Sequence, residues 1–362
     1  MANSRLPKSN SQLPTPNSQG VRFVTFGVVA LLLAALGGSS LAAQSAKAAM
    51  PQDPACQSLT PVSAGGPAPK DPNTVVVRWL GMMNYELAYR DQVFLLNAYF
   101  DRLPHSHPIG VQPADIRKAT AIFVGHAHFD HIADAPAIAG RIGAPVIGAS
   151  FGSDVATKAG LPAKQYTVAM PGEVFRYPGV TVETILGSHT DQAALAPAGF
   201  LDKQNAALRE ASLDKPLTDE EKKQADVIRA RGNTDPRINT EGVFNFLFTF
   251  GNGFRVMLID SAGKVTDAQR AAAQKTPAVD VAMIPYVGFE AGIPTVVDYV
   301  KLLQPAVVFL GAHDGAGTMN WASNYPPALA IRDASPKTRT MDVIYRTPVC
   351  FSAASKEMFV GW

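Results

Sequence analysis

Short apolar runs, separated by polar or glycine-containing stretches, recur along the chain from Thr74 onward. They are rich in β-branched and aromatic residues, which is typical of buried strands. We expect strands at 74–80, 92–97, 119–124, 145–148, 180–186, 243–250, 255–259, 279–284 and 306–310, and helices at 136–142 and around 295–303. A turn at 89–91 would join the first two strands as a hairpin, and the second helix would complete a β-α-β unit with its flanking strands.

The pattern changes between 202 and 231, where Lys, Glu, Asp, Gln and Ala dominate. Thr218-Asp-Glu-Glu221 matches a capping box and predicts the start of a helix. We therefore expect a helical insertion on a strand-rich body. It is either a solvated surface excursion or a lid over the functional site.

The N-terminal region has the pattern of an export signal. A polar, basic opening leads into an apolar run from Phe23 to Leu36, and Ala46-Lys47-Ala48 suits signal peptidase. We expect residues 1–49 to be a Sec-type signal peptide, cleaved near Ala48 or Ala49. The alternative is an uncleaved N-terminal anchor, although the apolar core is short for a membrane span. The protein would then be periplasmic or secreted, without a membrane span after cleavage. Residues 50–73, rich in Pro, Ala and Ser, are predicted to be a linker before a folded domain at 74–362.

The composition excludes several classes of protein. With 362 residues, 47% hydrophobic and 17% charged, the chain can bury a large core and is not disordered. Its 32 basic and 30 acidic residues give a net charge of +2. Four of the basic residues and none of the acidic ones precede Met50, so the rest of the chain has 28 basic and 30 acidic residues and a net charge of −2. This charge does not favour a nucleic-acid partner, and we expect a small-molecule substrate instead.

The chain has two cysteines, Cys56 and Cys350. In an oxidising compartment such a pair is a candidate disulfide that would join the two ends of the mature chain. Two separate buried thiols are the alternative, because the distance between the residues is not known from the sequence.

The predicted strand at 119–124 is followed by a cluster of metal-binding residue types, Gly125-His126-Ala-His128-Phe-Asp130-His131. Three of the chain's seven histidines fall within these few residues. Imidazole and carboxylate are ligands for divalent metals of borderline softness, zinc first. Alternate residues of an extended segment point the same way, so His126 and His128 can bind one cation while Asp130 and His131 address a second.

This pattern resembles that of the metallo-β-lactamase-fold hydrolases, whose signature is H-x-H-x-D-H after a strand, then a distant His, a distant Asp and a final His. His189 follows the strand at 180–186, Asp260 ends Val256-Met-Leu-Ile-Asp260, and His313 follows the strand at 306–310. The resemblance covers roughly 74–330. It implies an α/β fold, a four-layer αβ/βα sandwich with the helical insertion added.

The resemblance also implies a ligand set and a chemistry. His126, His128 and His189 would bind one Zn²⁺, and Asp130, His131 and His313 a second, with Asp260 bridging them. Two such cations, about 3.5–4 Å apart, would ionise a bridging water near neutral pH and polarise the bond under attack. Asp130 and Asp260 would act as the catalytic carboxylates by orienting this hydroxide, and Asp134 and Asp314 are candidates for fixing histidine tautomers.

The bridging Asp260 favours the lactonase, thioesterase and phosphodiesterase branches over true β-lactamases. The stretches Trp79-Leu-Gly81, Phe94-Leu-Leu-Asn97 and Ile284-Pro285 look like the branch of ascorbate-phosphate lactonase-like proteins and N-acyl-phosphatidylethanolamine phospholipase D. Two departures concern the expected pocket: Asn97 replaces the usual Asp, and Met82-Met83 replaces the usual Gly-His stretch.

Aromatic residues in loops after strands are predicted to shape the pocket: Tyr286, Phe289, Trp321 and Tyr325. A tyrosine hydroxyl there could donate to a developing oxyanion, although packing against the core is an alternative role for each. His105 and His107 form a second H-x-H pattern, which we interpret as part of a surface or pocket-rim loop.

The leading hypothesis is an exported hydrolase that uses two metals to cleave an ester, lactone or phosphoester bond. A di-iron oxidoreductase of the same fold is an alternative, although such enzymes usually have a Glu at the position of His128 and an added flavin domain. A nuclease is disfavoured by the charge and the export signal. A non-catalytic metal-binding protein is a further alternative, since Asn97 and Met82-Met83 depart from the family pattern.

Overall fold

The computed structural model describes residues 53–191, 193–196, 199–211, 216–251, 253–275, 278–315 and 321–360. The predicted signal peptide lies outside these residues. Residues 50–362 form one compact unit. No helix within the described ranges is both long and apolar enough to cross a bilayer.

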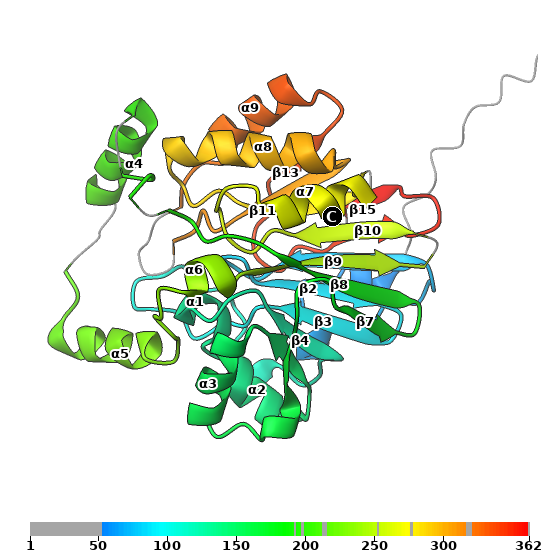
Figure 1. Ribbon diagram of the computed structural model, residues 1–362, viewed down its shortest axis with the longest axis horizontal. Helices are drawn as coiled ribbons and strands as arrows, with labels where there is room; N and C mark the ends of the chain where they lie inside the picture. Colours follow the sequence, from blue (N-terminus) through cyan, green and yellow to red (C-terminus); the bar gives the residue numbers. More distant parts are fainter. Residues whose placement is uncertain are drawn as a thin grey trace, which may run out of the picture. The chain divides into compact units, whose positions relative to one another are not determined.

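Two sheets form the centre of this unit (Figure 1). The first has eight strands in the order β15 (Met358–Val360), β14 (Val349–Ser352), β1 (Thr74–Trp79), β2 (Tyr85–Tyr89), β3 (Gln92–Leu96), β4 (Ala121–Val124), β5 (Val146–Gly148) and β6 (Tyr166–Val168). Pairing is antiparallel from β15 to β3 and parallel from β3 to β6.

The second sheet has seven strands in the order β13 (Arg339–Met341), β12 (Val307–Gly311), β11 (Val281–Pro285), β10 (Phe254–Leu258), β9 (Phe244–Phe250), β8 (Val180–Leu186) and β7 (Val174–Tyr177). The strands from β13 to β10 are parallel, and β10 to β7 are antiparallel.

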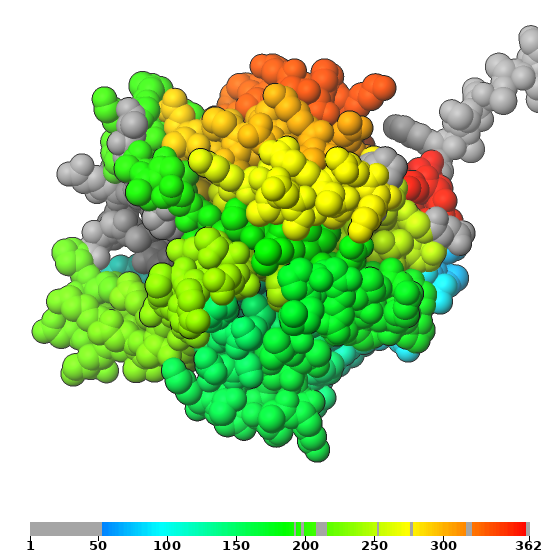
Figure 2. Space-filling view, viewed as in Figure 1, coloured from blue at the N-terminus to red at the C-terminus, as the bar shows by residue number. Residues whose placement is uncertain are grey.

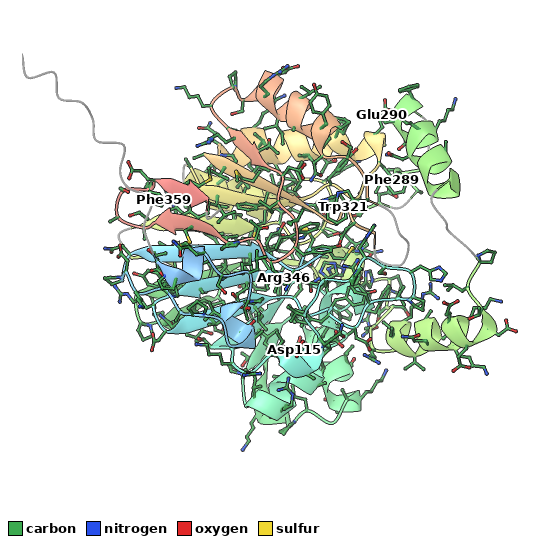
Figure 3. The ribbon with its side chains drawn as sticks, turned by 180° about the vertical axis from the view of Figure 1, so that it is seen from behind. Asp115, Phe289, Glu290, Trp321, Arg346 and Phe359 are labelled. Atoms are coloured by element: carbon green, nitrogen blue, oxygen red, sulfur yellow. A yellow bond between two sulfur atoms is a disulfide. The ribbon has the colours of Figure 1, made fainter. Side chains whose placement is uncertain are left out.

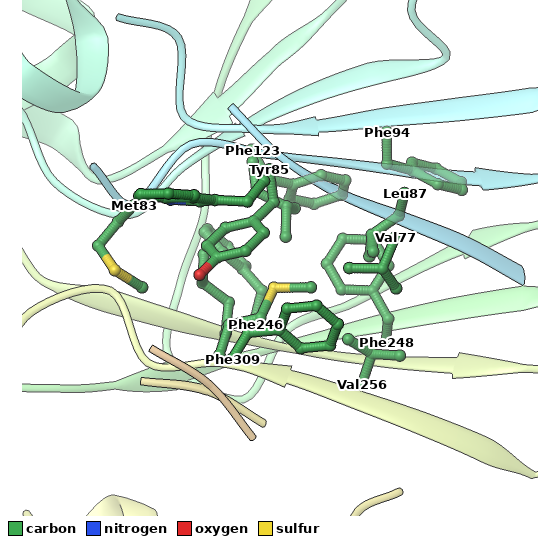
Figure 4. Close-up of a cluster of buried hydrophobic side chains, with 14 of the residues drawn as sticks. Val77, Met83, Tyr85, Leu87, Phe94, Phe123, Phe246, Phe248, Val256 and Phe309 are labelled. Carbon is green, nitrogen blue, oxygen red and sulfur yellow. The ribbon is translucent and has the colours of Figure 1, made fainter. Parts of the chain in front are cut away.

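A large apolar core lies between the two sheets. In β9 every second residue is a phenylalanine, so one face of the strand points into this core. Phe246 packs edge-on against Phe123 of β4 at 5.1 Å between ring centroids, and Phe248 against Phe94 of β3 at 5.5 Å (Figure 4). These contacts pack β9 against β4 and β3 across the sandwich, and β9 in turn pairs with β10.

Helices cover the outer faces of both sheets. The first sheet packs through a second core against α2 (Ala135–Ile142) and α3 (Ser150–Lys158). The second sheet packs through a third core against α7 (Asp267–Lys275), α8 (Ile293–Leu303) and α9 (Tyr325–Ala334). These four layers confirm the predicted αβ/βα sandwich. The remaining helices are α1 (Phe129–Ile132), α4 (Phe200–Ala211), α5 (Asp219–Arg229) and α6 (Ile238–Glu241).

The elements predicted from apolar runs are present, with ends within two residues of the expected positions. The helical insertion is confirmed as α4 and α5, and Thr218 and Glu221 form the predicted capping box. The hairpin prediction was wrong in one respect, because β2 lies between the two predicted strands and pairs with both. Its sequence contains Glu86, a residue type that is buried only when a partner compensates its charge.

That partner is Arg78, whose Nη1 lies 3.1 Å from Oε1 of Glu86, with both side chains fully buried. Glu86 also accepts hydrogen bonds from the backbone N–H groups of Val62 and Ser63, at 2.9 and 2.7 Å. The segment from 53 to 73 therefore packs on the first sheet as part of the folded unit, in contrast to the linker predicted there. The Cys56–Cys350 disulfide is confirmed and joins this segment to β14.

Candidate metal centre

Three loops that follow buried strands bring imidazoles and carboxylates together at one edge of the sandwich. The loop after β4 carries His126, and His128 is the N-cap residue of α1. His189 follows β8, and Asp260 follows β10. Each side chain stands directly after a strand whose apolar residues anchor it in the core.

His126, His128 and His189 form a first donor group, with ligand atoms within 4.8 Å of one another. Nε2 of His126 lies 3.1 Å from Nδ1 of His128. The ring centroid of His189 lies 5.0 Å from that of His126 and 4.6 Å from that of His128. Nδ1 of His189 donates to the carbonyl oxygen of Thr190 at 2.9 Å, so the neutral ring has its lone pair on Nε2.

A second donor group consists of His126, Asp130 and His131. Nε2 of His131 faces Oδ2 of Asp130 at 3.7 Å. This group shares His126 with the first, so the two potential cation positions are neighbours.

Asp260 lies beneath both groups and is 1% exposed. Its Oδ2 accepts a hydrogen bond from Nδ1 of His126 at 2.6 Å, and its Oδ1 accepts from Nδ1 of His131 at 3.1 Å and from Nδ2 of Asn97 at 2.7 Å. Burial alone would raise the pKa of Asp260, but His131 and His126 outweigh burial and hold the pKa well below its usual range. The carboxylate is therefore ionised and acts only as an acceptor, so both imidazoles present N–H at Nδ1.

The protonation of the histidines suits metal binding. Burial lowers the pKa of His126 to about 3 and that of His128 to about 4, with further lowering from neighbouring imidazoles. Burial also lowers the pKa of His189. These rings are neutral at pH 7, the form that ligates cations. His131 differs, because Asp260 and Asp130 outweigh the effect of burial and raise its pKa.

The donor atoms fit divalent cations. In a tetrahedral zinc site, two ligand nitrogens lie about 3.3 Å apart, close to the separation between His126 and His128. The Nδ1–H groups directed at Asp260 leave the Nε2 lone pairs of His126 and His131 free for a cation. Nε2 of His131 and the Asp130 carboxylate then face each other as two electron-pair donors, an arrangement that requires a proton or a cation between them.

The glycine that opens the motif is required by this packing. A Cβ atom on Gly125 would lie 1.8 Å from Cγ of Asp260 and 2.2 Å from each carboxylate oxygen. Only a residue without a side chain lets Asp260 approach the backbone of the His126 loop.

Comparison with known proteins agrees with this architecture. No family model matches the chain. It is 32% identical over 127 residues to a UPF0173 metal-dependent hydrolase of Pyrobaculum islandicum, which is 34% of this chain and 55% of that protein. The curated relatives are matched over 31% to 55% of their own length.

Solved structures extend the comparison to most of the described chain. Igni18, a metallo hydrolase from Ignicoccus hospitalis, has a TM-score of 0.53 at 15% identity and covers 77% of this chain and 98% of its own. YhfI of Bacillus subtilis, a metallo-β-lactamase fold protein, has a TM-score of 0.48 at 12% identity, covering 75% and 98%. The match to Igni18 agrees with the four-layer architecture and with the histidine-rich motif that follows β4. The chain has the metallo-β-lactamase fold.

The final histidine of the metallo-β-lactamase pattern occupies a different environment. His313 follows β12, its ring stacks on Trp79 at 4.6 Å, and its Nε2 lies 3.2 Å from Nδ2 of Asn324. It belongs to neither donor group. The structure thus brings together six of the seven predicted ligands and leaves His313 beside the aromatic side chains of Trp79 and Trp321.

A cavity of about 850 Å³ opens beside both donor groups. His128, Asp130 and His189 line it on one side, and residues between Arg229 and Asn239 line the other. The four aromatic residues predicted to shape the pocket do not line this cavity. Tyr286 is buried in the third core, Phe289 lies beside α4 (Figure 3), Trp321 packs on His313, and Tyr325 begins α9 and is 68% exposed.

The distal half of the insertion is fastened to the fold. Ala225 and Ile228 of α5 are buried. Glu221 accepts a hydrogen bond from Nε2 of His105 at 3.0 Å. The backbone N–H of Asn233 donates to the carbonyl of Ala127, inside the H-x-H motif, at 2.8 Å. In Figure 2 the light-green surface of α5 continues into that of the residues around α6.

The proximal half contacts the segment that follows β11. The backbone N–H of Leu201 in α4 donates to Oε2 of Glu290 at 3.0 Å, and the N–H of Glu290 donates to Oδ1 of Asp202 at 3.0 Å. Glu290 follows β11 of the second sheet, whereas α5 contacts α1 and the loop after β3. The insertion is therefore attached to the loops of both sheets.

Asp134 and Asp314, the predicted candidates for fixing histidine tautomers, accept hydrogen bonds from backbone N–H groups and from arginine side chains. Asp134 accepts from the N–H groups of Phe100 and Asp101, at 2.6 and 2.9 Å. Asp314 accepts from the N–H of Met82 at 3.0 Å and from Nη1 of Arg102 at 2.9 Å. The carboxylate that accepts hydrogen bonds from the imidazoles of His126 and His131 is Asp260, and Asn97 and Asn245 in turn contact Asp260.

Proposed function

We propose that this protein is an exported metal-dependent hydrolase that uses two divalent cations, zinc first, to cleave an ester, lactone or phosphoester bond. The observation that carries the proposal is the joint arrangement of His126, His128, Asp130, His131, His189 and Asp260 at one edge of a metallo-β-lactamase fold. The UPF0173 metal-dependent hydrolases that the chain resembles over part of its length support the same class of activity.

The cations, when bound, would lower the pKa of water and polarise the oxygen of the bond under attack. Asp130 is a carboxylate of the second donor group that also lines the cavity. It is therefore placed to accept a proton from attacking water and to orient it. Asp260 is buried and its oxygens are already hydrogen-bonded, so its role is to hold His126 and His131 in position.

Arg229, near the end of the insertion, and the residues from Gly232 to Asn239 that follow it supply the opposite wall of the substrate cavity in this proposal. Arg229 is the only Lys or Arg side chain that lines the cavity within the described residues. Its partner Asp226 lies 3.6 Å away, and both side chains are more than half exposed, so the pair is weak and the guanidinium can turn toward a substrate. The main contribution of 229–239 is steric, since these residues limit the size of what reaches Asp130.

Export is part of the proposal. The Cys56–Cys350 disulfide supports an oxidising compartment outside the cytoplasm. We expect the protein in the periplasmic or secreted fraction, with an N-terminus near Met50 by intact-mass measurement. Recovery of the protein in the cytoplasm with both thiols reduced would contradict export.

The decisive experiment combines metal analysis with turnover. Purified protein should contain about two zinc per chain and hydrolyse a member of a panel of nitrophenyl esters, bis-nitrophenyl phosphate and simple lactones. Asp130→Asn should reduce kcat by about 10²–10⁴. Asp333→Asn, the same substitution at an exposed aspartate of α9 that lies in neither donor group and does not line the cavity, serves as the matched control and should retain turnover. Metal-loaded protein that hydrolyses none of the panel would refute an ester-bond hydrolase, and two iron per chain would favour the oxidoreductase alternative.

A further inference from the structure

Asn97 stands where three parts of the metal centre meet. It follows β3, is 1% exposed, and has a left-handed backbone conformation with φ of 60°. Its backbone N–H donates to the carbonyl of Phe123 at 2.7 Å, which anchors it to β4. The side chain can therefore act as a fixed reference for the groups around it.

The orientation of the Asn97 amide is determined by its neighbours. Oδ1 accepts a hydrogen bond from the backbone N–H of Gly125 at 2.9 Å. Nδ2 donates to Oδ1 of Asp260 at 2.7 Å and to the carbonyl oxygen of Met83 at 2.9 Å. A flipped amide would place its oxygen against a carboxylate and a carbonyl, and its NH₂ group against an N–H donor. One orientation alone satisfies every group.

We infer that Asn97 is a positioning residue of the metal centre: it holds Asp260 in the rotamer that directs the Nε2 atoms of His126 and His131 toward the cations. This inference rests on the proposed metal site. Without the Nδ2 donor, Oδ1 of Asp260 loses the one partner that is not itself a potential metal ligand. Asp260 and the two imidazoles would then turn as a unit, because nothing rigid would fix the carboxylate.

The same contacts explain why an amide stands at this position. An aspartate has the same shape and could still accept from Gly125, but it has no donor for Asp260 or for Met83. Its charge would lie against the buried Asp260 carboxylate, and two carboxylates at hydrogen-bond distance cannot both be ionised. Met83 packs at the end of the inter-sheet core (Figure 4), so its carbonyl is also held in place.

The test separates positioning from packing by using an isosteric variant. Asn97→Asp preserves the volume and the bond to Gly125, and Asn97→Ala removes all side-chain contacts. Asn84→Ala is the matched control, because Asn84 is a fully buried amide in the adjacent loop whose Nδ2 donates to the carbonyl of Gly81, away from both donor groups. Zinc affinity is measured by competition with a chelator, and the Co²⁺-substituted proteins are compared by their visible absorption spectra.

We expect both Asn97 variants to bind zinc 10- to 100-fold more weakly, with an altered Co²⁺ spectrum, while Asn84→Ala keeps the affinity and spectrum of the natural protein. Should Asn97→Ala fail to fold, Asn97→Asp decides alone. An affinity of Asn97→Asp within twofold of the natural protein, with an identical spectrum, would overturn the inference and leave the proposed function standing. Equal weakening by Asn84→Ala would also overturn it. Natural protein that binds neither zinc nor cobalt would overturn the proposed function, and the inference with it.

Discussion

Gly125→Ala is the smallest change that tests the metal centre, because it adds one methyl group outside every predicted ligand. The new Cβ would lie 1.8 Å from Cγ of Asp260, whereas ordinary contacts are 3.4–4 Å. Either the loop after β4 or the Asp260 side chain must move by about 1.6 Å to reach ordinary contact. Both are anchored in the core, so the carboxylate is expected to leave its position.

The cost follows from the hydrogen bonds that Asp260 makes. His126, His131 and Asn97 donate to it at 2.6, 3.1 and 2.7 Å. Hydrogen bonds to a charged group contribute about 1.5–3 kcal/mol each, and relaxation recovers part of the loss. We expect the free energy of unfolding of the metal-free protein to fall by about 3–5 kcal/mol and zinc affinity to fall 10- to 100-fold.

Chemical denaturation and chelator competition measure the two effects. Gly140→Ala is the control: its Cβ would meet only Cδ1 of Leu161 at 3.8 Å, and it lies within α2, where alanine favours the helix by about 0.5–1 kcal/mol. If Gly125→Ala binds zinc as tightly as Gly140→Ala and unfolds at the same denaturant concentration, Asp260 does not pack against this backbone and the described arrangement of the centre is refuted.

Three further outcomes are expected. Metal content should fall in two steps as the pH is lowered from 8. His131 takes up a proton first and weakens the second donor group, because Asp260 and Asp130 raise its pKa against the effect of burial. His126 and His128, with pKa values of about 3 and 4, retain the first cation below pH 6. Simultaneous loss of both metals would contradict this order. Glu86→Gln should lower the free energy of unfolding by about 3–5 kcal/mol in denaturant titrations, because it leaves the buried Arg78 guanidinium uncompensated, and an unchanged midpoint would show that this charge is solvated or paired elsewhere. Reduction of the Cys56–Cys350 disulfide, whose cysteines are 294 residues apart in sequence, should lower the free energy of unfolding by about 2–5 kcal/mol. The measurement is the denaturation midpoint with and without reductant, and equal midpoints would show that the disulfide does not restrict the unfolded chain.

Much of the fold could be predicted because its signals are local. An apolar run such as Val180–Leu186 indicates a strand regardless of its neighbours, and Thr218 with Glu221 caps α5 through bonds within one turn. The same holds for the H-x-H-x-D-H cluster, whose residues are close in sequence and follow a single strand. These patterns predicted the strands and the core of a metal site, whereas the four-layer fold was implied by the resemblance to the metallo-β-lactamase-fold hydrolases.

Other features depend on partners that are distant in sequence. Glu86 could not be assigned to a buried strand from its own segment, because the compensating Arg78 and the N–H groups of Val62 and Ser63 come from β1 and from the supposed linker. Likewise the family pattern predicted His313 as a ligand, but stacking on Trp79 and the contact with Asn324 depend on how the loop after β12 packs.

The amino-acid sequence by itself therefore determined nine of the fifteen strands in the described residues and where the donor residues cluster, and the family resemblance added Asp260 to them. Only the tertiary structure decided what Asp260 touches, why Gly125 and Asn97 stand beside it, and that the 202–231 insertion reaches the cavity. The physical reason is that a buried charge or hydrogen-bonding group is stable only with a complementary partner, and the fold chooses that partner by distance in space.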